Sequence, residues 1–250
     1  SWLLSPSSDG EFPVIVYGLN PVLEALRAGR VRAIRLGTAS SPRTAEVRRL
    51  ATAAGTPVTR VPTEVLDRVT GGAVHQGVVA DVAILAPLTL DELIAGATAP
   101  ALLLVLDGIE DPQNLGAILR SAECAGVTGV VLPRHRAARV TATATKAAAG
   151  AIEHLRLTSV SGLPKALGLL AEAGVWSVGL DSVGDVVVHE LAVADQPVAL
   201  VMGAEGAGLS RLVRERCDTL VRIPLQGVLA SMNVSAAAAV ALFEVARHRS

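Results

Sequence analysis

Three separated stretches of the sequence carry side chains suited to group transfer or anion binding. DPQNLGAILRSAECAG contains Asn114 and Arg120, VMGAEGAGLS contains Glu205 among glycines, and ASMNVSAAAAV contains Asn233. A guanidinium can hold a phosphate or stabilise an oxygen that becomes negative during a reaction. Carboxylate and amide groups can orient such a cation or a substrate. These three stretches are therefore where the sequence could carry out chemistry.

The glycine-rich stretch VMGAEGAGLS does not fit the known phosphate-binding loops. A P-loop needs GxxxxGK[ST], whereas no lysine precedes Ser210, and the spacing of Gly203, Gly206 and Gly208 is not that of a dinucleotide fingerprint. Glu205 in the same loop would repel an anion. The glycines indicate a sharp turn or a close approach of the backbone, and the loop favours a neutral or cationic ligand.

A purely structural interpretation of these residues is also open. Asn114 could cap a helix, Arg120 could pair with Glu123 three residues later, and Ser231 or Asn233 could cap the last helix. That interpretation leaves the long glycine-containing loop before the last helix unexplained. The acidic residues near 107–111 have no matching cluster elsewhere in the sequence, so we expect no metal site.

The elements that position these stretches form an α/β pattern. Residues 101–250 predict strands near 101–107, 127–132, 175–180, 198–202 and 219–223, with helices near 114–125, 141–149, 162–173, 209–215 and 233–248. The apolar run ALLLVLD is typical of a parallel strand covered on both faces. We expect an open, mainly parallel sheet, whose ligands bind beyond the carboxyl ends of its strands.

The N-terminal part predicts a separate, small α/β domain. Strands and helices alternate over 14–85, and the Pro-, Thr- and Ala-containing stretch 86–100 is the expected linker to the domain at 101–250. Residues 1–13 have no basic region before a short apolar part, which predicts a disordered tail rather than a signal peptide.

Composition and charge narrow the possible partners. The net charge is −1, but residues 1–80 hold nine arginines against six acidic residues, so the N-terminal third is the better candidate for contacting a nucleic acid. Five aromatic residues are too few for a base-stacking platform. No apolar run reaches the roughly 18 residues of a membrane span. With two widely spaced cysteines, we expect reduced thiols in a soluble, cytoplasmic protein.

The three stretches, with IPLQGVLASMNVSAAAAVALFE as the last, resemble in order and spacing the motifs of the SpoU (TrmH) family of RNA ribose 2′-O-methyltransferases, of the SPOUT superfamily. YGLNPVLEALRAG and GAVHQGVVADV resemble the L30e-like substrate-binding domain of its RlmB subgroup, which methylates a guanosine ribose in 23S rRNA. The resemblance implies a deep trefoil knot in the C-terminal domain, S-adenosylmethionine as the methyl donor, large-subunit rRNA as the partner and an obligate homodimer.

The resemblance also implies roles for individual residues. Asn114, Arg120, Glu205 and Asn233 match the catalytic positions of the motifs. The positions expected to contact the cofactor are Gly203, Ile223, Met232, Met202, Leu225 and Gly227. Relatives usually carry leucine at the position of Met232 and methionine at that of Leu225, and both exchanges preserve apolar volume.

The expected RNA-binding residues are Arg134, Arg136, Arg139, Lys146, Arg30 and Arg32. Thr141 and Ala147 depart from the polar or bulkier residues common in relatives. Two alternatives remain at this point. One is a ribose 2′-O-methyltransferase acting on tRNA or another rRNA nucleotide, and the other is a non-catalytic RNA-binding assembly factor.

Overall fold

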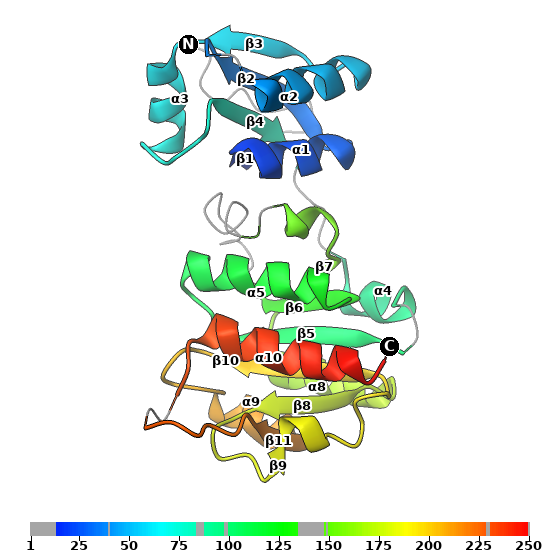
Figure 1. Cartoon of the computed structure of the whole chain (residues 1–250). Helices are drawn as coiled ribbons and strands as arrows, with labels where there is room; N and C mark the ends of the chain where they lie inside the picture. The colour runs from blue at the N-terminus through cyan, green and yellow to red at the C-terminus, as the bar shows by residue number, and fades with distance from the viewer. Residues whose placement is uncertain are drawn as a thin grey trace. The chain divides into compact units, whose positions relative to one another are not determined.

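The structure, a computed structural model, describes residues 14–39, 41–83, 88–97, 100–134, 148, 150–228 and 231–249 of the chain. It divides into two units, shown in Figure 1. The first contains residues up to Ala86 together with Ala148–Glu153, and the second contains Pro87–Ala147 and His154–Ser250. The expected helix at 141–149 lies almost entirely outside the described residues.

The first unit is a four-stranded sheet packed against helices. Its elements are β1 (Val14–Tyr17), α1 (Leu19–Arg27), β2 (Val31–Gly37), α2 (Pro42–Ala53), β3 (Val58–Val61), α3 (Thr63–Thr70) and β4 (Val78–Val82). The strand order is β1-β4-β2-β3, with β4 antiparallel to both neighbours and β2 parallel to β3. Val22, Ile34 and Val47 are among the buried residues of its core. The alternation predicted from sequence is confirmed here.

A short segment from much later in the chain completes this unit. The 3-10 helix η1 (Ala151–Glu153) packs with α1, and Glu153 forms an ion pair with Arg30 while only 1% of its side chain is exposed. Gly150 lies against Glu24, since a Cβ at Gly150 would be 2.5 Å from the Glu24 Cγ. The first unit is therefore discontinuous, unlike the continuous domain expected at 14–85.

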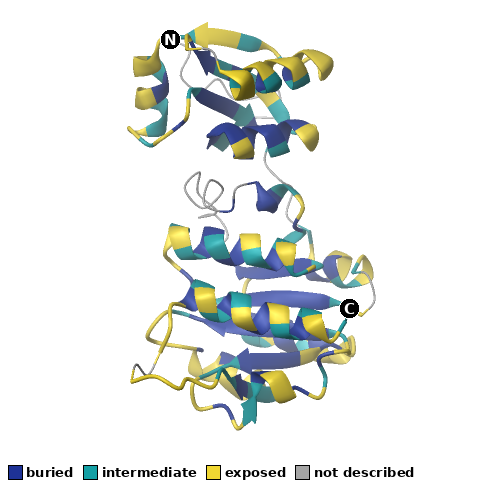
Figure 2. Cartoon of the chain, viewed as in Figure 1, coloured by how far each residue is buried: buried dark blue, intermediate teal, exposed yellow. Residues whose placement is uncertain are grey.

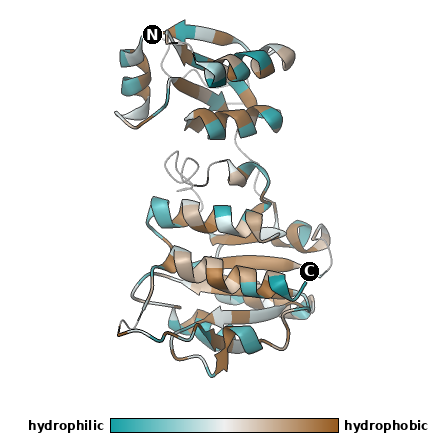
Figure 3. Ribbon diagram, in the orientation of Figure 1, coloured by the Kyte–Doolittle hydropathy of each residue, from teal (hydrophilic) through white to brown (hydrophobic). Residues whose placement is uncertain are grey.

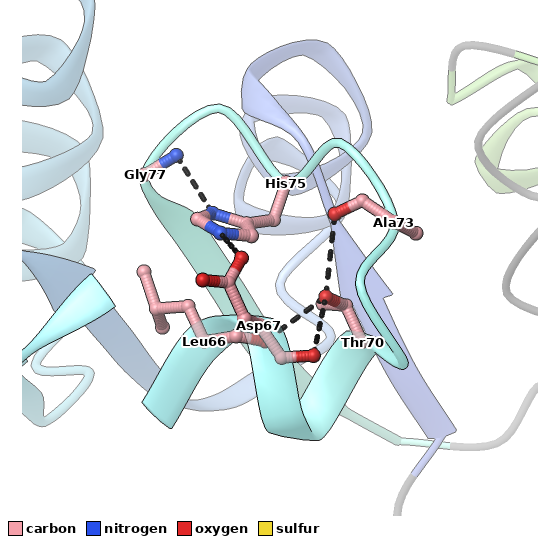
Figure 4. A network of polar contacts seen from close by, with 6 residues as sticks. All are labelled: Leu66, Asp67, Thr70, Ala73, His75 and Gly77. Carbon is pink, nitrogen blue, oxygen red and sulfur yellow. Dashed lines mark hydrogen bonds and ion pairs between the residues drawn. The ribbon is translucent and has the colours of Figure 1, made fainter. Parts of the chain in front are cut away.

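A hydrogen-bonded turn joins α3 to β4 in the first unit (Figure 4). The buried His75 accepts a hydrogen bond from the Gly77 amide at Nδ1 (3.0 Å), so Nε2 carries the proton that faces Asp67 Oδ1 at 3.0 Å. Gln76 has a φ of 53° and accepts a bond from the Leu19 amide at 3.0 Å. The turn therefore holds Gln76 in a backbone conformation that residues other than glycine rarely adopt.

The second unit is built on a seven-stranded sheet. Its strands are β5 (Leu102–Asp107), β6 (Gly129–Pro133), β7 (Leu157–Val160), β8 (Trp176–Leu180), β9 (Val186–Val187), β10 (Val198–Gly203) and β11 (Thr219–Arg222). Its helices are α4 (Leu90–Ala95), α5 (Pro112–Cys124), α8 (Leu163–Glu172), η2 (Val188–Glu190), α9 (Arg211–Arg216) and α10 (Val234–Arg247). The strand order is β7-β6-β5-β10-β8-β11-β9, and every pairing is parallel. This confirms the predicted parallel sheet.

The central strands of the sheet are buried on both faces. Leu102–Leu106 of β5 and Val198–Met202 of β10 are all at most 2% exposed. Figure 2 draws buried residues in dark blue, and Figure 3 shows the apolar character of β5 in brown. Helix α10 packs along α5 and against β10. Helix α8 contributes Leu167 and Leu170 to the core cluster that includes Leu103. Burial on both faces is what makes these strands continuous apolar runs.

Two parts of the second unit differ from the sequence predictions. Stretch 86–100, expected to be a linker, contains α4, which begins with a capping box between Thr89 and Glu92 and buries Leu93 completely in the core. A Cβ at Gly129 would be 2.4 Å from the Leu93 Cδ1, which shows how tightly α4 packs. Strands β7 and β9 were not predicted, because neither has a long apolar run of its own.

Candidate active site

Three of the four candidate catalytic residues meet at one edge of the parallel sheet. Asn114 Nδ2 donates to Glu205 Oε2 at 3.0 Å, and Asn233 Nδ2 donates to Asn114 Oδ1 at 3.0 Å and to Glu205 Oε1 at 3.5 Å. The residues follow β5, β10 and β11, whose carboxyl ends lie at the same edge. The structure therefore joins positions that are 91 and 119 residues apart.

The N-cap of α10 determines which atoms donate and which accept in this amide network. Asn233 is the N-cap of α10, and its Oδ1 accepts from the amides of Ser235 and Ala236, so its Nδ2 is the group that faces Asn114. Asn114 must then accept at Oδ1 and donate through Nδ2 to the Glu205 carboxylate. The orientation of all three groups follows from one helix cap.

Asp111, not Asn114, is the N-cap of α5. Its carboxylate accepts from the amides of Gln113 and Asn114, both at 3.2 Å. The structural interpretation in which Asn114 caps the helix is therefore wrong, and its side chain is available to the network. The sequence does carry a signal for this cap: aspartate is preferred at the N-cap, and Pro112 follows it at the first helical position, where proline is common.

The glycines of the second stretch shape a tight hairpin that carries Glu205 near its tip. The Ala204 amide donates to the Gly208 carbonyl at 3.0 Å, and the Gly208 amide donates to the Ala204 carbonyl at 2.8 Å. Gly206 and Gly208 both have positive φ. A Cβ at Gly203 would lie 2.0 Å from the carbonyl carbon of Gly208, so the chain folds back directly over Gly203. The sharp turn and close approach expected from these glycines are both present.

Asp107 anchors the other end of this hairpin. Its Oδ2 accepts from the amide of Ser210 at 2.7 Å, and it is paired with Gly203 in the register of β5 with β10. Sequence reasoning considered Asp107 only as a weak metal ligand and missed this role. Nothing in the sequence around Asp107 indicates its partner Ser210, which is 103 residues away.

A cleft of about 450 Å³ opens between the first and second stretches. Its lining residues include four carboxylates, those of Asp107, Glu110, Asp111 and Glu205. Leu209 and Val234 supply apolar surface, and Gly208 leaves the backbone accessible. Such a cleft suits a ligand that carries positive charge and also has apolar parts.

Arg120 does not join the network within this chain. It is exposed on α5 and has no hydrogen bond or ion pair with another described residue, so the expected pairing with Glu123 is absent. Six residues separate it from Asn114, which on an α-helix corresponds to about 9 Å along the axis and about 240° around it. The two side chains therefore leave different faces of α5.

The positions expected to contact the cofactor divide into two groups. Met202 and Gly203 end β10 and are buried, and Met202, only 1% exposed, belongs to the hydrophobic core. Ile223 directly follows β11 and is partly buried. Leu225, Gly227 and Met232 belong to the exposed segment before α10. None of the six lines the 450 Å³ cleft, and their role stays a prediction.

The expected RNA-binding residues have different surroundings. Arg134 is exposed just after β6, and Arg32 is exposed on β2. Arg30 is instead held inside the first unit, where its guanidinium binds Glu153 and the carbonyl of Ala83. Arg136, Arg139 and Lys146 lie outside the described residues.

Two further properties concern the described part of the chain only. Within it, no group of three or more His, Cys, Asp or Glu side chains is arranged to hold a metal ion. No helix among these residues has the length and apolar character to cross a membrane.

Comparison with known proteins identifies related sequences. The family model described as SpoU rRNA Methylase family matches residues 101–243, and the model for RNA 2′-O ribose methyltransferase substrate binding matches residues 15–88. An uncharacterized tRNA/rRNA methyltransferase of Mycobacterium ulcerans is 44% identical over 239 residues, which cover 94% of this chain and 77% of that protein. A similarly described protein of Mycobacterium leprae is 42% identical with the same coverage.

Solved structures agree with these sequence matches. The SpoU methyltransferase AviRb of Streptomyces viridochromogenes, solved in complex with AdoMet, has a TM-score of 0.81 at 27% identity, covering 94% of this chain and 90% of that one. An AdoMet-bound rRNA methyltransferase of Sinorhizobium meliloti has a TM-score of 0.73 at 25% identity, covering 94% and 87%. With its parallel sheet, its three converging motifs and these matches, the chain belongs to the SpoU rRNA methylase family.

Proposed function

We propose that this protein transfers a methyl group from S-adenosylmethionine to a ribose 2′-hydroxyl of RNA, and that its target is a guanosine of 23S rRNA. The observation that carries the methyltransferase assignment is the network of Asn114, Glu205 and Asn233, because it joins all three family motifs at the ligand-binding edge of the sheet. An assembly factor without catalytic activity would not need these side chains to meet. The match of residues 15–88 to a substrate-binding model supports an RNA substrate.

The residues of the cleft fit the chemistry of the methyl donor. S-adenosylmethionine carries its methyl group on a positively charged sulfonium, which supplies an activated leaving group when the cofactor is bound. Carboxylates of Asp107, Glu110 and Glu205 favour a cation at this edge of the sheet. Gly203 ends β10 and Ile223 directly follows β11. They lie outside the cleft but at the same edge of the sheet, where they would offer backbone groups and apolar surface to the rest of the cofactor.

Arg120 has a separate role in this proposal. A ribose hydroxyl is a weak nucleophile that becomes negative as it attacks, and a neighbouring phosphate adds further negative charge. The exposed guanidinium of Arg120 would hold that phosphate and stabilise the forming alkoxide. Asn114, Glu205 and Asn233 would keep the three loops in the geometry that aligns hydroxyl and methyl group.

Replacement of Arg120 by alanine tests this role. We expect Arg120→Ala to lower kcat/KM for methyl transfer to rRNA by roughly 100-fold or more, which is typical for loss of a group that stabilises an oxyanion. The affinity for S-adenosylmethionine, measured by calorimetry, should not change. Arg216→Ala is the control, since Arg216 is exposed at the end of α9, just before β11 begins, and so lies at the opposite edge of the sheet from the network. Near-normal turnover by Arg120→Ala would contradict the assignment.

We further propose that the active protein is a homodimer whose site draws Arg120 from one subunit and the amide network from the other. In support, Arg120 points away from Asn114, and α10 exposes Val240 (41%) and Phe243 (51%) next to α5. Co-expressed Arg120→Ala and Asn114→Ala chains should then regain activity that neither variant has alone. Failure to regain it, with mixed dimers verified by mass, would reject the shared site.

A separate experiment tests whether the substrate is 23S rRNA. Ribose methylation is mapped in rRNA and tRNA from cells with and without this gene, and the purified protein is assayed on both RNAs. We expect one guanosine of the large-subunit rRNA to lose its 2′-O-methyl group without the gene. A missing methyl group in tRNA alone would replace this target with the tRNA alternative.

A further inference from the structure

The first unit contains a group of arginines that its own carboxylates do not neutralise. Arg27 pairs with Glu24 and Glu46, Arg30 with Glu153, and Arg35 with Asp81. Arginines without an ion pair to a described residue are Arg32, Arg43, Arg48, Arg49, Arg60 and Arg68. Of the carboxylates in the described residues of this unit, only Glu64 has no hydrogen bond or ion pair. The described residues of this unit hold nine arginines against six carboxylates, a net charge of +3.

Two of these arginines share one hollow. Arg48 of α2 and Arg60 of β3 line a depression with Leu36, Gly37, Ala39 and Thr44, and no acidic residue takes part. The Arg48 guanidinium has no hydrogen bond with the described residues, and that of Arg60 has only a long one of 3.5 Å to the carbonyl of Thr38. The hollow is shallow, with a volume of about 10 Å³. A phosphate would therefore lie over it, between two exposed guanidinium groups that have no carboxylate partner among the described residues.

The floor of this hollow is held in place by the turn of Figure 4. The Gly37 amide donates to the carbonyl of Gly77 at 2.9 Å, and the Gly77 amide donates to Nδ1 of His75. Parallel pairing of β2 with β3 sets Leu36 opposite Arg60. The hollow therefore lies on β2, β3 and α2, with Ala39 from the loop after β2. A site held by regular elements loses less entropy when it binds.

We propose that Arg48 and Arg60 form a clamp for a backbone phosphate of the RNA substrate. This inference rests on the proposed function for the identity of the ligand, because the clamp itself recognises phosphate and reads no base. It assigns the first unit a concrete gripping surface, formed by α2 and β3, in place of Arg30, whose guanidinium is already bound. Such contacts fix the position of an RNA without specifying its sequence.

The test compares two double variants of the full chain. Arg48→Gln/Arg60→Gln removes the clamp, and Arg27→Gln/Arg211→Gln removes the same charge from two exposed arginines that already have carboxylate partners. Binding of a fluorescein-labelled RNA stem-loop is followed by anisotropy over a range of salt concentrations. Thermal unfolding of each variant verifies its fold, and the single variant Arg60→Gln replaces the double variant if that one unfolds.

We expect the clamp variant to bind RNA about fivefold more weakly at roughly 0.15 M salt, with a slope of log affinity against log salt reduced by about 0.9, the value for one neutralised phosphate. The control should keep the wild-type slope. In methyl-transfer assays the KM for rRNA should rise without a change in kcat. Equal slopes and affinities for the wild type and the clamp variant would overturn the clamp.

The outcome also separates the clamp from the proposed function. If the wild type methylates no RNA but the clamp variant still loses stem-loop affinity, the clamp stands and the enzymatic assignment fails. If the wild type methylates rRNA and the variant has an unchanged KM, the clamp fails alone. Binding of the wild type to anionic lipid vesicles but not to the stem-loop would reject RNA as the ligand.

Discussion

A single methyl group at Gly203 should disrupt the candidate site. In Gly203→Ala the added Cβ would lie 2.0, 2.2 and 2.3 Å from Gly208 C, Gly208 O and Leu209 N. All three are backbone atoms of the Glu205 hairpin, so no flexible side chain can move aside. The hairpin must retreat from β10 by more than 1 Å to restore ordinary contacts, which begin near 3.4 Å.

The size of the effect follows from what this retreat breaks. Overpacking in a filled site costs about 1–3 kcal/mol, and the two Ala204–Gly208 hydrogen bonds contribute about 1 kcal/mol each. The free energy of unfolding should thus fall by about 3–5 kcal/mol, a drop in Tm of roughly 10 °C for a unit of this size. Displacement of Glu205 should abolish methyl transfer even below the new Tm.

The same substitution elsewhere in the second unit provides the control. Gly168 lies inside α8, where a Cβ would meet no atom within 4 Å. Gly168→Ala should raise stability by about 0.5–1 kcal/mol, because alanine loses less conformational freedom in a helix. Calorimetric melting and calorimetric binding of S-adenosylmethionine measure both variants. If Gly203→Ala melts and turns over like the wild type, the hairpin is not packed as described and the reasoning is refuted.

Two further predictions concern stability and thiol chemistry. The Arg249 guanidinium donates to the carbonyls of Pro100, Ala194 and Gln196. Arg249→Gln should therefore lower the free energy of unfolding in urea by about 2 kcal/mol. Loss of the exposed Arg247 should lower it by under about 0.5 kcal/mol, and equal losses would contradict this role of Arg249. Burial, with help from neighbouring carboxylates, raises the pKa of the Cys217 thiol to about 12. Iodoacetamide should therefore alkylate the exposed Cys124 but spare Cys217 in the native protein. The thiol of the unfolded chain has a pKa of about 8.5, whereas the folded thiol has one of about 12. The free energy of unfolding should therefore fall as the pH rises from about 8.5 toward 12, because only the unfolded thiol loses its proton there. Rapid labelling of Cys217, or the same alkaline loss of stability in Cys217→Ser, would refute the burial.

Local sequence patterns were sufficient for most of the elements but not for their partners. The apolar runs of β5 and β10 and the helix before Gly126 are periodic signals that the structure reproduces. Short strands such as β7 are formed by pairing with β6 and lack a pattern of their own. Family motifs brought Asn114, Glu205 and Asn233 to attention, yet only the fold reveals that Asp111 takes over the capping and frees Asn114.

Charge shows the same limit. Arg30 and Arg48 are equivalent in the sequence, where both contribute to the basic N-terminal third. In the structure Arg30 is neutralised by Glu153, 123 residues later, while Arg48 has no carboxylate partner. Composition can therefore predict that a unit is basic, but the choice of arginines depends on long-range pairing. The trefoil knot likewise depends on how the chain threads, which no local pattern encodes, and it stays a prediction.

The late contribution of η1 to the first unit has a consequence for synthesis of the chain. A ribosome makes β1 through β4 first, but the helix that packs on α1 and supplies Glu153 is translated only after β5 and β6. Until then Arg30 lacks its carboxylate partner. The N-terminal unit thus reaches its final form only after synthesis of the second unit has begun. The two units therefore cannot fold strictly one after the other during translation.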